Sequence, residues 1–278
     1  MSRARPTAGD RIVDAAIARI REGGISVGLD GISLEDAIAA SGVSRATAYR
    51  HWPSRVEFLR AVLVRVVRDA RLEPEGAEEI EAIRAFVMAR RAQLASDAGR
   101  RTIVVEGLRI SADADFRRLA NSREWRDYLA LRATCSSLPE GDLRTTITAE
   151  LAAAERSFAA HRATVYSRLP RLLGYRLVPP LSGQRGFELM AEIMGALMTG
   201  LVVRAAVAED IEPFRVRAFG SSVRSEWTST SYGLVSTFLS YLEPDPTIEW
   251  TAERAAASIA QFQEMERLIQ PGPHRYGA

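Results

Sequence analysis

One short stretch of the sequence, SGVSRATAYRHWPSR from Ser41 to Arg55, concentrates side chains that donate hydrogen bonds. It contains three arginines, a histidine, a tyrosine and a threonine, and no aspartate or glutamate. A guanidinium can donate two hydrogen bonds to O6 and N7 of guanine, and hydroxyl or imidazole groups can donate to phosphate oxygens. The stretch therefore predicts contact with duplex DNA. The competing interpretation is an ordinary solvated helix of a helical bundle.

The residues around this stretch indicate two short helices joined by a tight turn. Ser33 can cap a helix that ends at Ser41 and Gly42, and Ser44 can cap a second helix that Pro53 closes. Glycine suits the turn because it adopts positive backbone angles without a steric cost. This arrangement is typical of a helix-turn-helix unit, whose second helix projects into the major groove of DNA.

The second of these helices is expected to have two different sides. Val43, Ala48 and Trp52 can face inward and anchor the helix. The opposite side would then present Arg45, Ala46, Thr47, Tyr49 and Arg50. Donors that cluster without acids, together with the glycine turn, favour DNA binding over a merely solvated helix.

The segment from Arg11 to Leu59 resembles the DNA-binding domain of the TetR family of transcriptional regulators. The resemblance is carried by IVDAAIARIREGG and then by SLEDAIAASGVSRATAYRHWPSRVEFL. The family's hallmark is a Gly-Val-Ser turn, Thr-x-Tyr in the recognition helix, His before an aromatic residue, a basic residue and an apolar pair. This chain supplies it as Gly42-Val43-Ser44, Thr47, Tyr49, His51-Trp52, Arg55 and Phe58-Leu59.

The resemblance implies roles in DNA binding for particular residues. It assigns base contacts to Arg45, Ala46 and Arg50. It assigns phosphate contacts to the starts of the two helices and to the polar residues that follow, namely Ser33, Ser44, Thr47, Tyr49, His51 and Arg55. Glu35 is expected to point toward DNA, where it would repel phosphate or accept a hydrogen bond from a cytosine amine.

Apolar periodicity predicts helices almost throughout the chain, and the expected fold class is all-α. We expect an N-terminal three-helix domain with the helix-turn-helix unit over residues 1–60, and a larger helical bundle for dimerisation and ligand binding over 61–278. A fourth helix is expected from Pro53 to about Arg71, and others at roughly 77–97, 100–111, 113–136, 141–172, 185–208, 228–242 and 251–269. No strand run is evident, and RVRAFGSSVRSEW is expected to be a partly extended connector.

The segment ELMAEIMGALMTGLVVRAAV, which begins at Glu188, resembles the dimerisation helix of the TetR family. One stripe of this helix is expected to carry Leu189, Ile193, Leu197 and Leu201. Gly195 and Gly200 would permit close approach of another helix. The competing interpretation is a central core helix of one subunit. The most apolar run, from Ile193, is expected to be too short to span a bilayer.

Aromatic and polar residues at helical spacing are candidates for a ligand pocket. Trp125, Tyr128, Arg132 and Cys135 lie on one segment, and His161 and Tyr166 lie on the next. Each of them, taken alone, is more typical of a core or surface residue. The pocket residues that we predict are Trp125, Tyr128, Arg132 and Tyr166.

Composition and motifs exclude several classes of protein. The chain has 278 residues, a formal net charge of +2 and one cysteine, Cys135, which excludes an internal disulfide and a cysteine-based zinc site. The N-terminus has no long apolar core and no signal-peptide cleavage pattern, so a cytoplasmic location is expected. The sequence contains none of the P-loop, dinucleotide-binding, zinc-peptidase or nucleophile-elbow motifs, and we expect no catalysis, cofactor or metal.

Taken with these exclusions, the resemblance implies a homodimeric transcriptional repressor. It would bind double-stranded operator DNA of palindromic sequence and be released by a small apolar or amphipathic effector, without a membrane partner. One alternative is a regulator of the same fold that answers to a protein partner or to no effector. Another is an all-helical ligand-binding protein without DNA binding.

Overall fold

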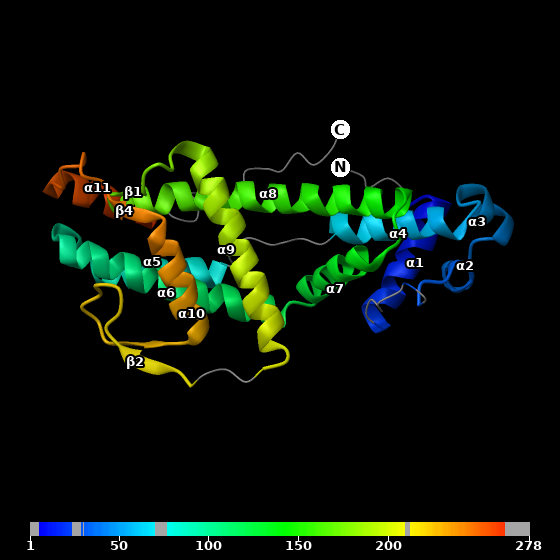
Figure 1. Ribbon diagram of the computed structural model, residues 1–278, viewed down its shortest axis with the longest axis horizontal. Coiled ribbons are helices and arrows are strands. Elements are labelled where there is room, and N and C mark those ends of the chain that lie inside the picture. The colour runs from blue at the N-terminus through cyan, green and yellow to red at the C-terminus, as the bar shows by residue number, and fades with distance from the viewer. Residues whose placement is uncertain (1–5, 24–28, 30, 70–76, 209–211, 265–278) are drawn as a thin grey trace. The chain divides into compact units, whose positions relative to one another are not determined.

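The chain is almost entirely helical, as expected. The computed structural model describes residues 6–23, 29, 31–69, 77–208 and 212–264 (Figure 1). Within these residues the chain forms eleven α-helices, one short 3-10 helix and four strands of three residues each. The all-α fold class is therefore confirmed.

The helices and strands have the following bounds along the chain. The first seven α-helices are α1 (Ala8–Gly23), α2 (Leu34–Ser41), α3 (Arg45–His51), α4 (Arg55–Asp69), α5 (Ala77–Ala89), α6 (Asp97–Asn121) and α7 (Arg123–Ser137), with the 3-10 helix η1 (Arg91–Ala95) before α6. The others are α8 (Asp142–Leu172), α9 (Gly183–Ala205), α10 (Ser229–Ser240) and α11 (Ala252–Gln263). The strands are β1 (Tyr175–Leu177), β2 (Phe214–Val216), β3 (Ser225–Trp227) and β4 (Leu242–Pro244).

The chain divides into two compact units. The first consists of residues 1–72 and 122–157, and the second of residues 73–121 and 158–278. The first unit therefore holds α1 to α4, α7 and the start of α8, and the second holds the remaining elements. This division differs from the expected boundary at residue 60, because α4 stays with the first three helices and α7 packs on α4.

The start of α1 shows how local sequence sets an element of the first unit. The hydroxyl of Thr7 accepts a hydrogen bond from the backbone N–H of Asp10 at 3.1 Å, and the Asp10 carboxylate accepts one from the backbone N–H of Thr7 at 2.9 Å. This reciprocal pair satisfies N–H groups that have no partner within the helix. The apolar face that follows is buried, with exposed fractions of 6% or less at Ile12, Val13, Ala16, Ile17 and Ile20.

The predicted break between residues 111 and 113 is wrong, because α6 runs without interruption from Asp97 to Asn121. The small and acidic residues of SADAD resemble a helix end, but ion pairs one turn apart hold them within the helix. Arg109 lies 3.6 Å from Asp113, and Arg118 lies 2.6 Å from Asp115. The break falls instead at Ser122, whose hydroxyl caps α7 by accepting from the backbone N–H of Trp125 at 3.1 Å.

The expectation that the chain has no strands is also wrong. β1 pairs with β4, and β2 pairs with β3, each as a two-stranded antiparallel sheet. The segment expected to be an extended connector forms the β2–β3 hairpin, whose loop contains Phe219 and Gly220 with φ of 52° and 83°. Strands of three residues are too short to produce a recognisable alternating pattern in the sequence.

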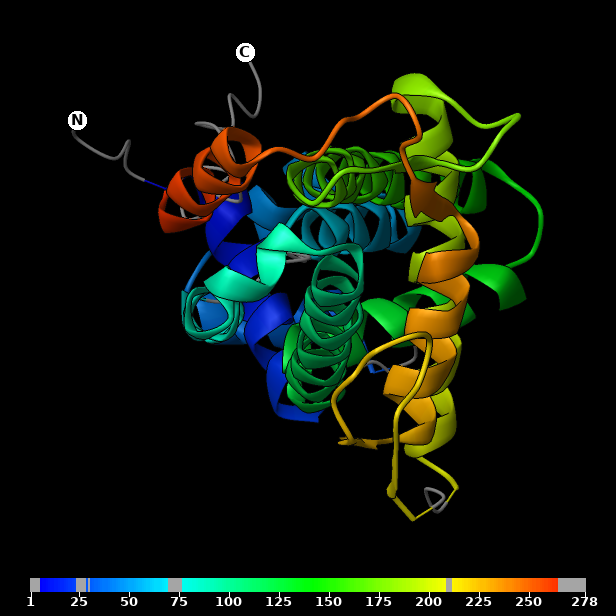
Figure 2. The same ribbon diagram turned by 90° about the vertical axis from the view of Figure 1, so that its left-hand side faces the viewer.

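A buried polar cluster holds this hairpin to α6 in the second unit. Glu106, which is 1% exposed, accepts hydrogen bonds from the hydroxyls of Ser221 at 2.7 Å and Ser225 at 2.6 Å. Arg109 donates to the same carboxylate at 2.9 Å. Trp227 of β3 is fully buried beside Val105. α10 packs against both α6 and α9, and Figure 2 shows α10 beside α9.

Candidate nucleic-acid interface

The turn between α2 and α3 has the geometry that its residues predict. The hydroxyl of Ser33 accepts from the backbone N–H of Asp36 at 3.2 Å and caps α2. Gly42 ends α2 in the left-handed conformation, with φ 67° and ψ 15°. Ser44 then caps α3 by accepting from the backbone N–H of Thr47 at 3.3 Å. The start and end of α2 and the start of α3 therefore follow from three local signals, as the sequence indicates.

The inner side of α3 is fixed by a small set of apolar contacts. Ala48 is fully buried, and Val43 in the preceding turn is 7% exposed. Trp52 follows the helix and makes an edge-on ring contact with Phe58 of α4, with 5.4 Å between ring centroids. These three residues face inward as predicted, so α3 has a defined orientation despite its length of seven residues.

The outer side of α3 presents the residues to which base contacts are assigned. Arg45, Ala46 and Arg50 are all exposed. The Arg50 guanidinium donates to the hydroxyl of Thr47 at 3.3 Å, and that hydroxyl lies 2.9 Å from the hydroxyl of Ser44. Ser44 and His51 are also exposed, while Thr47 is partly buried. One surface therefore carries two guanidiniums, a methyl group and several hydroxyls.

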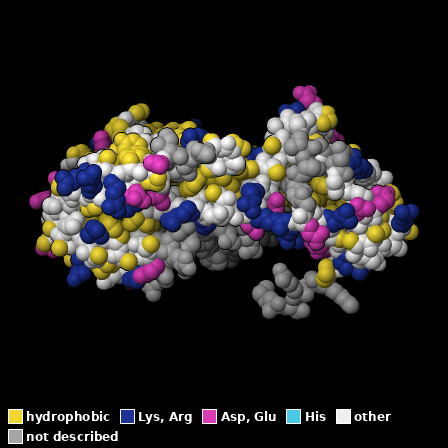
Figure 3. All heavy atoms as spheres, turned by 90° about the horizontal axis from the view of Figure 1, so that it is seen from below, with side chains coloured by type: hydrophobic (Ala, Val, Ile, Leu, Met, Phe, Trp, Pro, Cys, Tyr) yellow, Lys and Arg dark blue, Asp and Glu magenta, His cyan; other side chains and the backbone are white. Residues whose placement is uncertain are grey.

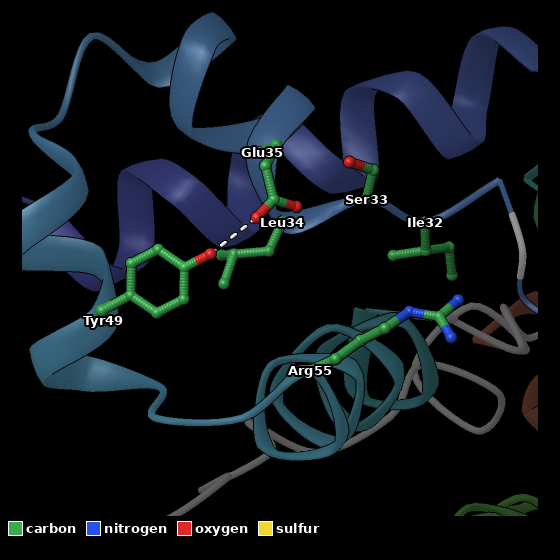
Figure 4. Close-up of a pocket in the computed structure, with 6 residues that line it drawn as sticks. All are labelled: Ile32, Ser33, Leu34, Glu35, Tyr49 and Arg55. Atoms are coloured by element: carbon green, nitrogen blue, oxygen red, sulfur yellow. Dashed lines mark hydrogen bonds between the residues drawn. The ribbon is translucent and has the colours of Figure 1, made fainter.

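Tyr49 makes a contact that spacing along the sequence does not reveal. Its hydroxyl donates to the Glu35 carboxylate of α2 at 2.6 Å (Figure 4). This hydrogen bond lowers the pKa of Glu35 below its ordinary value and raises the pKa of Tyr49. Glu35 is therefore a carboxylate at neutral pH, and the hydroxyl expected to contact phosphate has a protein partner in the free chain.

Arg55 likewise has a protein contact that the sequence did not predict. Its guanidinium donates to the backbone carbonyl of Leu29 at 3.2 Å. Leu29 is 3% exposed and has a positive φ of 62°, which is uncommon for a residue other than glycine. The hydrogen bond supports the backbone just before α2.

A pocket of about 460 Å³ opens between the start of α2, the outer side of α3 and the start of α4. Its lining residues are Ile32, Ser33, Leu34, Glu35, Tyr49 and Arg55, drawn in Figure 4. Three of the six, Ser33, Tyr49 and Arg55, are residues with a predicted phosphate contact. The structure therefore brings these three together at one concave site, with the carboxylate of Glu35 among them.

The predicted ligand-pocket residues lie in different units. Trp125 and Tyr128 are buried in the first unit, and their rings stack with 5.5 Å between centroids. The Tyr128 hydroxyl donates to Glu155 at 3.0 Å, and Arg132 forms an ion pair with the same carboxylate at 2.6 Å. Tyr166 lies in the second unit, where its ring packs edge-on against Phe238 at 4.9 Å. A role of these four residues in ligand binding stays a prediction.

One side of α9 is buried, and the other presents an exposed apolar stripe beside the exposed charged residues Glu192 and Arg204. The buried side carries Gly186, Phe187, Met190, Ala191, Met194, Met198 and Val202. The exposed side carries Leu189, Ile193, Ala196, Gly200 and Val203, at alternating spacings of four and three residues. Leu197 and Leu201, expected on this stripe, are partly buried, because a stripe at constant spacing of four turns gradually around a helix of 3.6 residues per turn.

The length of α9 corrects one expectation. The apolar run from Ile193 is only part of α9, which begins at Gly183 and has 23 residues. Among the described residues it is the one helix that is long and apolar enough, by length and composition, to cross a membrane. A single helix of this kind is weak support for a membrane span, because a core helix of a water-soluble protein meets the same criteria. The burial of one side of α9 against α6 and α10 fits such a core helix.

Exposed large apolar side chains are concentrated in the second unit. Figure 3 shows hydrophobic side chains at the surface on one face of the molecule. Among the described residues of the second unit, the exposed large apolar side chains are Leu189, Ile193, Val203, Val207, Phe214, Val216 and Tyr232.

Comparison with known proteins does not identify a relative. No protein-family model, no curated protein and no solved structure matches the chain. No cluster of three or more potential metal ligands occurs within the described residues. The resemblance to the TetR family therefore depends on the residues of the N-terminal segment and on the geometry that they adopt.

Proposed function

We propose that the protein is a TetR-like transcriptional regulator that binds duplex DNA through α3. The observation that carries the proposal is the orientation of α3, because Ala48 anchors its inner side and Arg45 and Arg50 are exposed on the other. Gly42, in the left-handed conformation, turns the chain between α2 and α3. A helix fixed in this way can enter the major groove with its donors toward the base edges.

The chemistry of the outer side fits DNA better than it fits other polyanions. Two guanidiniums can each donate two hydrogen bonds to guanine, and the methyl of Ala46 can contact a thymine methyl. The capped starts of α2 and α3 direct backbone N–H groups toward an anion, which suits phosphates on either side of a groove. The side chains thus supply both kinds of contact that sequence-specific recognition needs.

The apolar exposed side of α9 supports a homodimer. Leu189 and Ile193 are 42% and 43% exposed, and an added Cβ on Gly195 or Gly200 would meet nothing within 4 Å. Spacings of four and three residues are those of helices that pack side by side. A two-fold dimer would present two copies of α3 to half-sites about 34–36 Å apart, which implies a palindromic operator.

We further propose that the regulator is a repressor released by a small apolar or amphipathic effector. This part of the proposal depends only on the resemblance to the TetR family. The buried Trp125–Tyr128 pair is a candidate for contact with the effector. An effector would have to bind the DNA-free state more tightly, with a coupling of about 1–3 kcal/mol that acts equally in both directions. Compounds that bind the protein can be found because they raise its melting temperature. If none of these compounds changes the affinity of the protein for its operator, the effector part of the proposal is wrong.

The experiment that tests DNA binding begins with selection of bound duplexes from a random library. The selected duplex is then titrated against the protein at two salt concentrations. We expect a palindromic consensus, and binding at least 10³-fold tighter than to unrelated DNA, as is usual for specific DNA-binding proteins. Enrichment of no sequence, or binding that is equal for all duplexes, would favour the alternative of a ligand-binding protein without DNA recognition.

A further inference from the structure

The carboxylate of Glu35 occupies an unusual place on a surface proposed to bind DNA. It lies in the first turn of α2, in the same pocket as Ser33 and Arg55, and accepts the Tyr49 hydroxyl at 2.6 Å. The contact draws an acid from α2 toward the outer side of α3 (Figure 4). Arg45 is near enough for its charge to lower the pKa of Glu35 further, so this acid and a proposed base-reading arginine share one surface.

A carboxylate on such a surface can have few favourable partners. It is acceptor-only when ionised, and phosphate oxygens and the O6, N7 and O4 atoms in the major groove are acceptors as well. The donors that the major groove presents are the amino groups of cytosine and adenine. Adenine places its amino group beside the acceptor N7 of the same base, which would face the second carboxylate oxygen, whereas the major-groove edge of cytosine itself carries the amine and no acceptor.

The hydrogen bond with Tyr49 leaves the carboxylate capable of a further contact. A carboxylate has two oxygens and about four lone-pair sites, of which the hydroxyl uses one. The hydroxyl also restricts the rotamers of a side chain that would otherwise move freely, because Glu35 is exposed. The contact therefore fixes an acceptor in one direction before DNA binds, which lowers the entropy lost on binding.

We propose that Glu35, positioned by Tyr49, reads a cytosine through its exocyclic amine and so extends base recognition from α3 to α2. The inference rests on the proposed function and adds one specificity-determining residue to it. Tyr49 acts here as a positioning residue. At a sequence without this cytosine, the Glu35 carboxylate would face acceptor atoms of the bases. Their repulsion would further reduce binding to sequences other than the operator.

The test uses the full chain and a panel of duplexes that carry each base at every position of one half-site. Glu35→Gln should change the preferred base at a single position from cytosine to adenine, because an amide can both accept from the amino group and donate to N7. Glu35→Ala should remove the preference at that position, with a loss of roughly 5- to 150-fold for the cytosine duplex per half-site. Tyr49→Phe should weaken the cytosine preference without replacing it by another base.

Glu140→Gln serves as the matched control, because Glu140 is an exposed acid of the same unit in the loop before α8. It should leave every base preference unchanged, and the melting temperature of each variant checks that the fold is intact. If Glu35→Gln changes the affinity for all duplexes by the same factor, Glu35 faces phosphate and the inference is wrong. If the unchanged protein shows no sequence preference at all, the proposed function fails instead.

Discussion

Helices α3 and α9 have the same kind of buried side and opposite kinds of exposed side. Each is anchored by apolar residues, Ala48 in α3 and Met190 among others in α9. Outside, α3 presents guanidiniums and hydroxyls, whereas α9 presents Leu189, Ile193 and Val203 at 42%, 43% and 51% exposure. The buried sides explain why each helix forms, and the exposed sides are the basis of the partner that we propose for each.

The difference separates two kinds of partner. Exposed guanidiniums on α3, a helix that contains no acidic residue, suit a hydrated polyanion, which supplies acceptors at regular spacing. An exposed apolar stripe gains nothing from a polyanion and is stabilised by another apolar surface, with about 25 cal/mol for each Å² removed from water. DNA recognition and self-association are therefore assigned to different helices, and each assignment can be tested by substitutions that leave the other helix unchanged.

The largest effect is expected from a charge on the exposed stripe of α9. Ile193→Glu should convert a dimer into a monomer of 30.6 kDa in light scattering, because the stripe would bury two like charges. Operator affinity should fall by roughly 10²-fold or more, since the two recognition helices then bind independently. Ile193 is a better site than Leu197, which is partly buried and whose replacement would also disturb the fold.

Ile193→Leu is the control, because it keeps an apolar side chain at the same place and should remain dimeric. An unchanged dimer mass for Ile193→Glu would show that the stripe of α9 is not the interface. If the unchanged protein is itself monomeric at micromolar concentration, the dimer part of the proposal is wrong.

Replacement of two glycines by alanine, one in the turn before α3 and one in α9, should change the stability of the protein in opposite directions. Gly42 has a φ of 67°, and Gly42→Ala should lower the free energy of unfolding by about 1–2 kcal/mol because a Cβ is unfavourable in the left-handed region. Gly200 lies within α9 with open space around it, and Gly200→Ala should stabilise the monomer by up to about 1 kcal/mol. Denaturant unfolding of both variants, in the background of Ile193→Glu, measures these changes without the dimer.

Gly200→Ala should at the same time weaken dimerisation if two helices approach closely at that residue. If Gly200→Ala stabilises the monomer but leaves the dimerisation affinity of the protein unchanged, the partner helix contacts α9 elsewhere. A Gly42→Ala protein of unchanged stability would contradict the turn geometry on which the orientation of α3 depends.

The smallest effect on operator affinity is expected from Arg55. Arg55→Ala should weaken binding to all duplexes by a similar factor and lower the slope of log affinity against log salt by about one per half-site. It also removes a hydrogen bond to the Leu29 carbonyl, so unfolding should become easier by about 1 kcal/mol. A salt slope that does not change, with stability reduced, would mean that Arg55 supports the backbone near Leu29 and does not contact phosphate.

The sequence predicts those features of the site that are encoded locally. Ser33, Gly42 and Ser44 act within four residues of the groups that they cap or turn, and each has the role expected of its residue type. The burial of Ala48 follows from helical periodicity. The predictions failed in the middle of α6, where ion pairs one turn apart accompany an uninterrupted helix, and in the expected connector, which forms the β2–β3 hairpin held by Glu106.

The unpredicted parts of the site are contacts between residues distant in sequence. Tyr49 and Glu35 are 14 residues apart, and Arg55 and Leu29 are 26 apart. Such pairs depend on how α2, α3 and α4 pack, which no spacing rule specifies. The sequence predicted that Glu35 points toward DNA, whereas its hydrogen bond with Tyr49 follows from the packing of the folded chain.

The central claim is that α3 reads bases through Arg45 and Arg50. The most direct measurement is a titration of Arg45→Ala and Arg50→Ala against single-base variants of the selected operator at two salt concentrations. We expect an intact fold, a loss of about 1–3 kcal/mol per half-site for the preferred duplex, and a relaxed preference at one base pair for each arginine. If both variants weaken every duplex by the same factor, neither arginine reads a base, and the account of α3 as the recognition helix is contradicted.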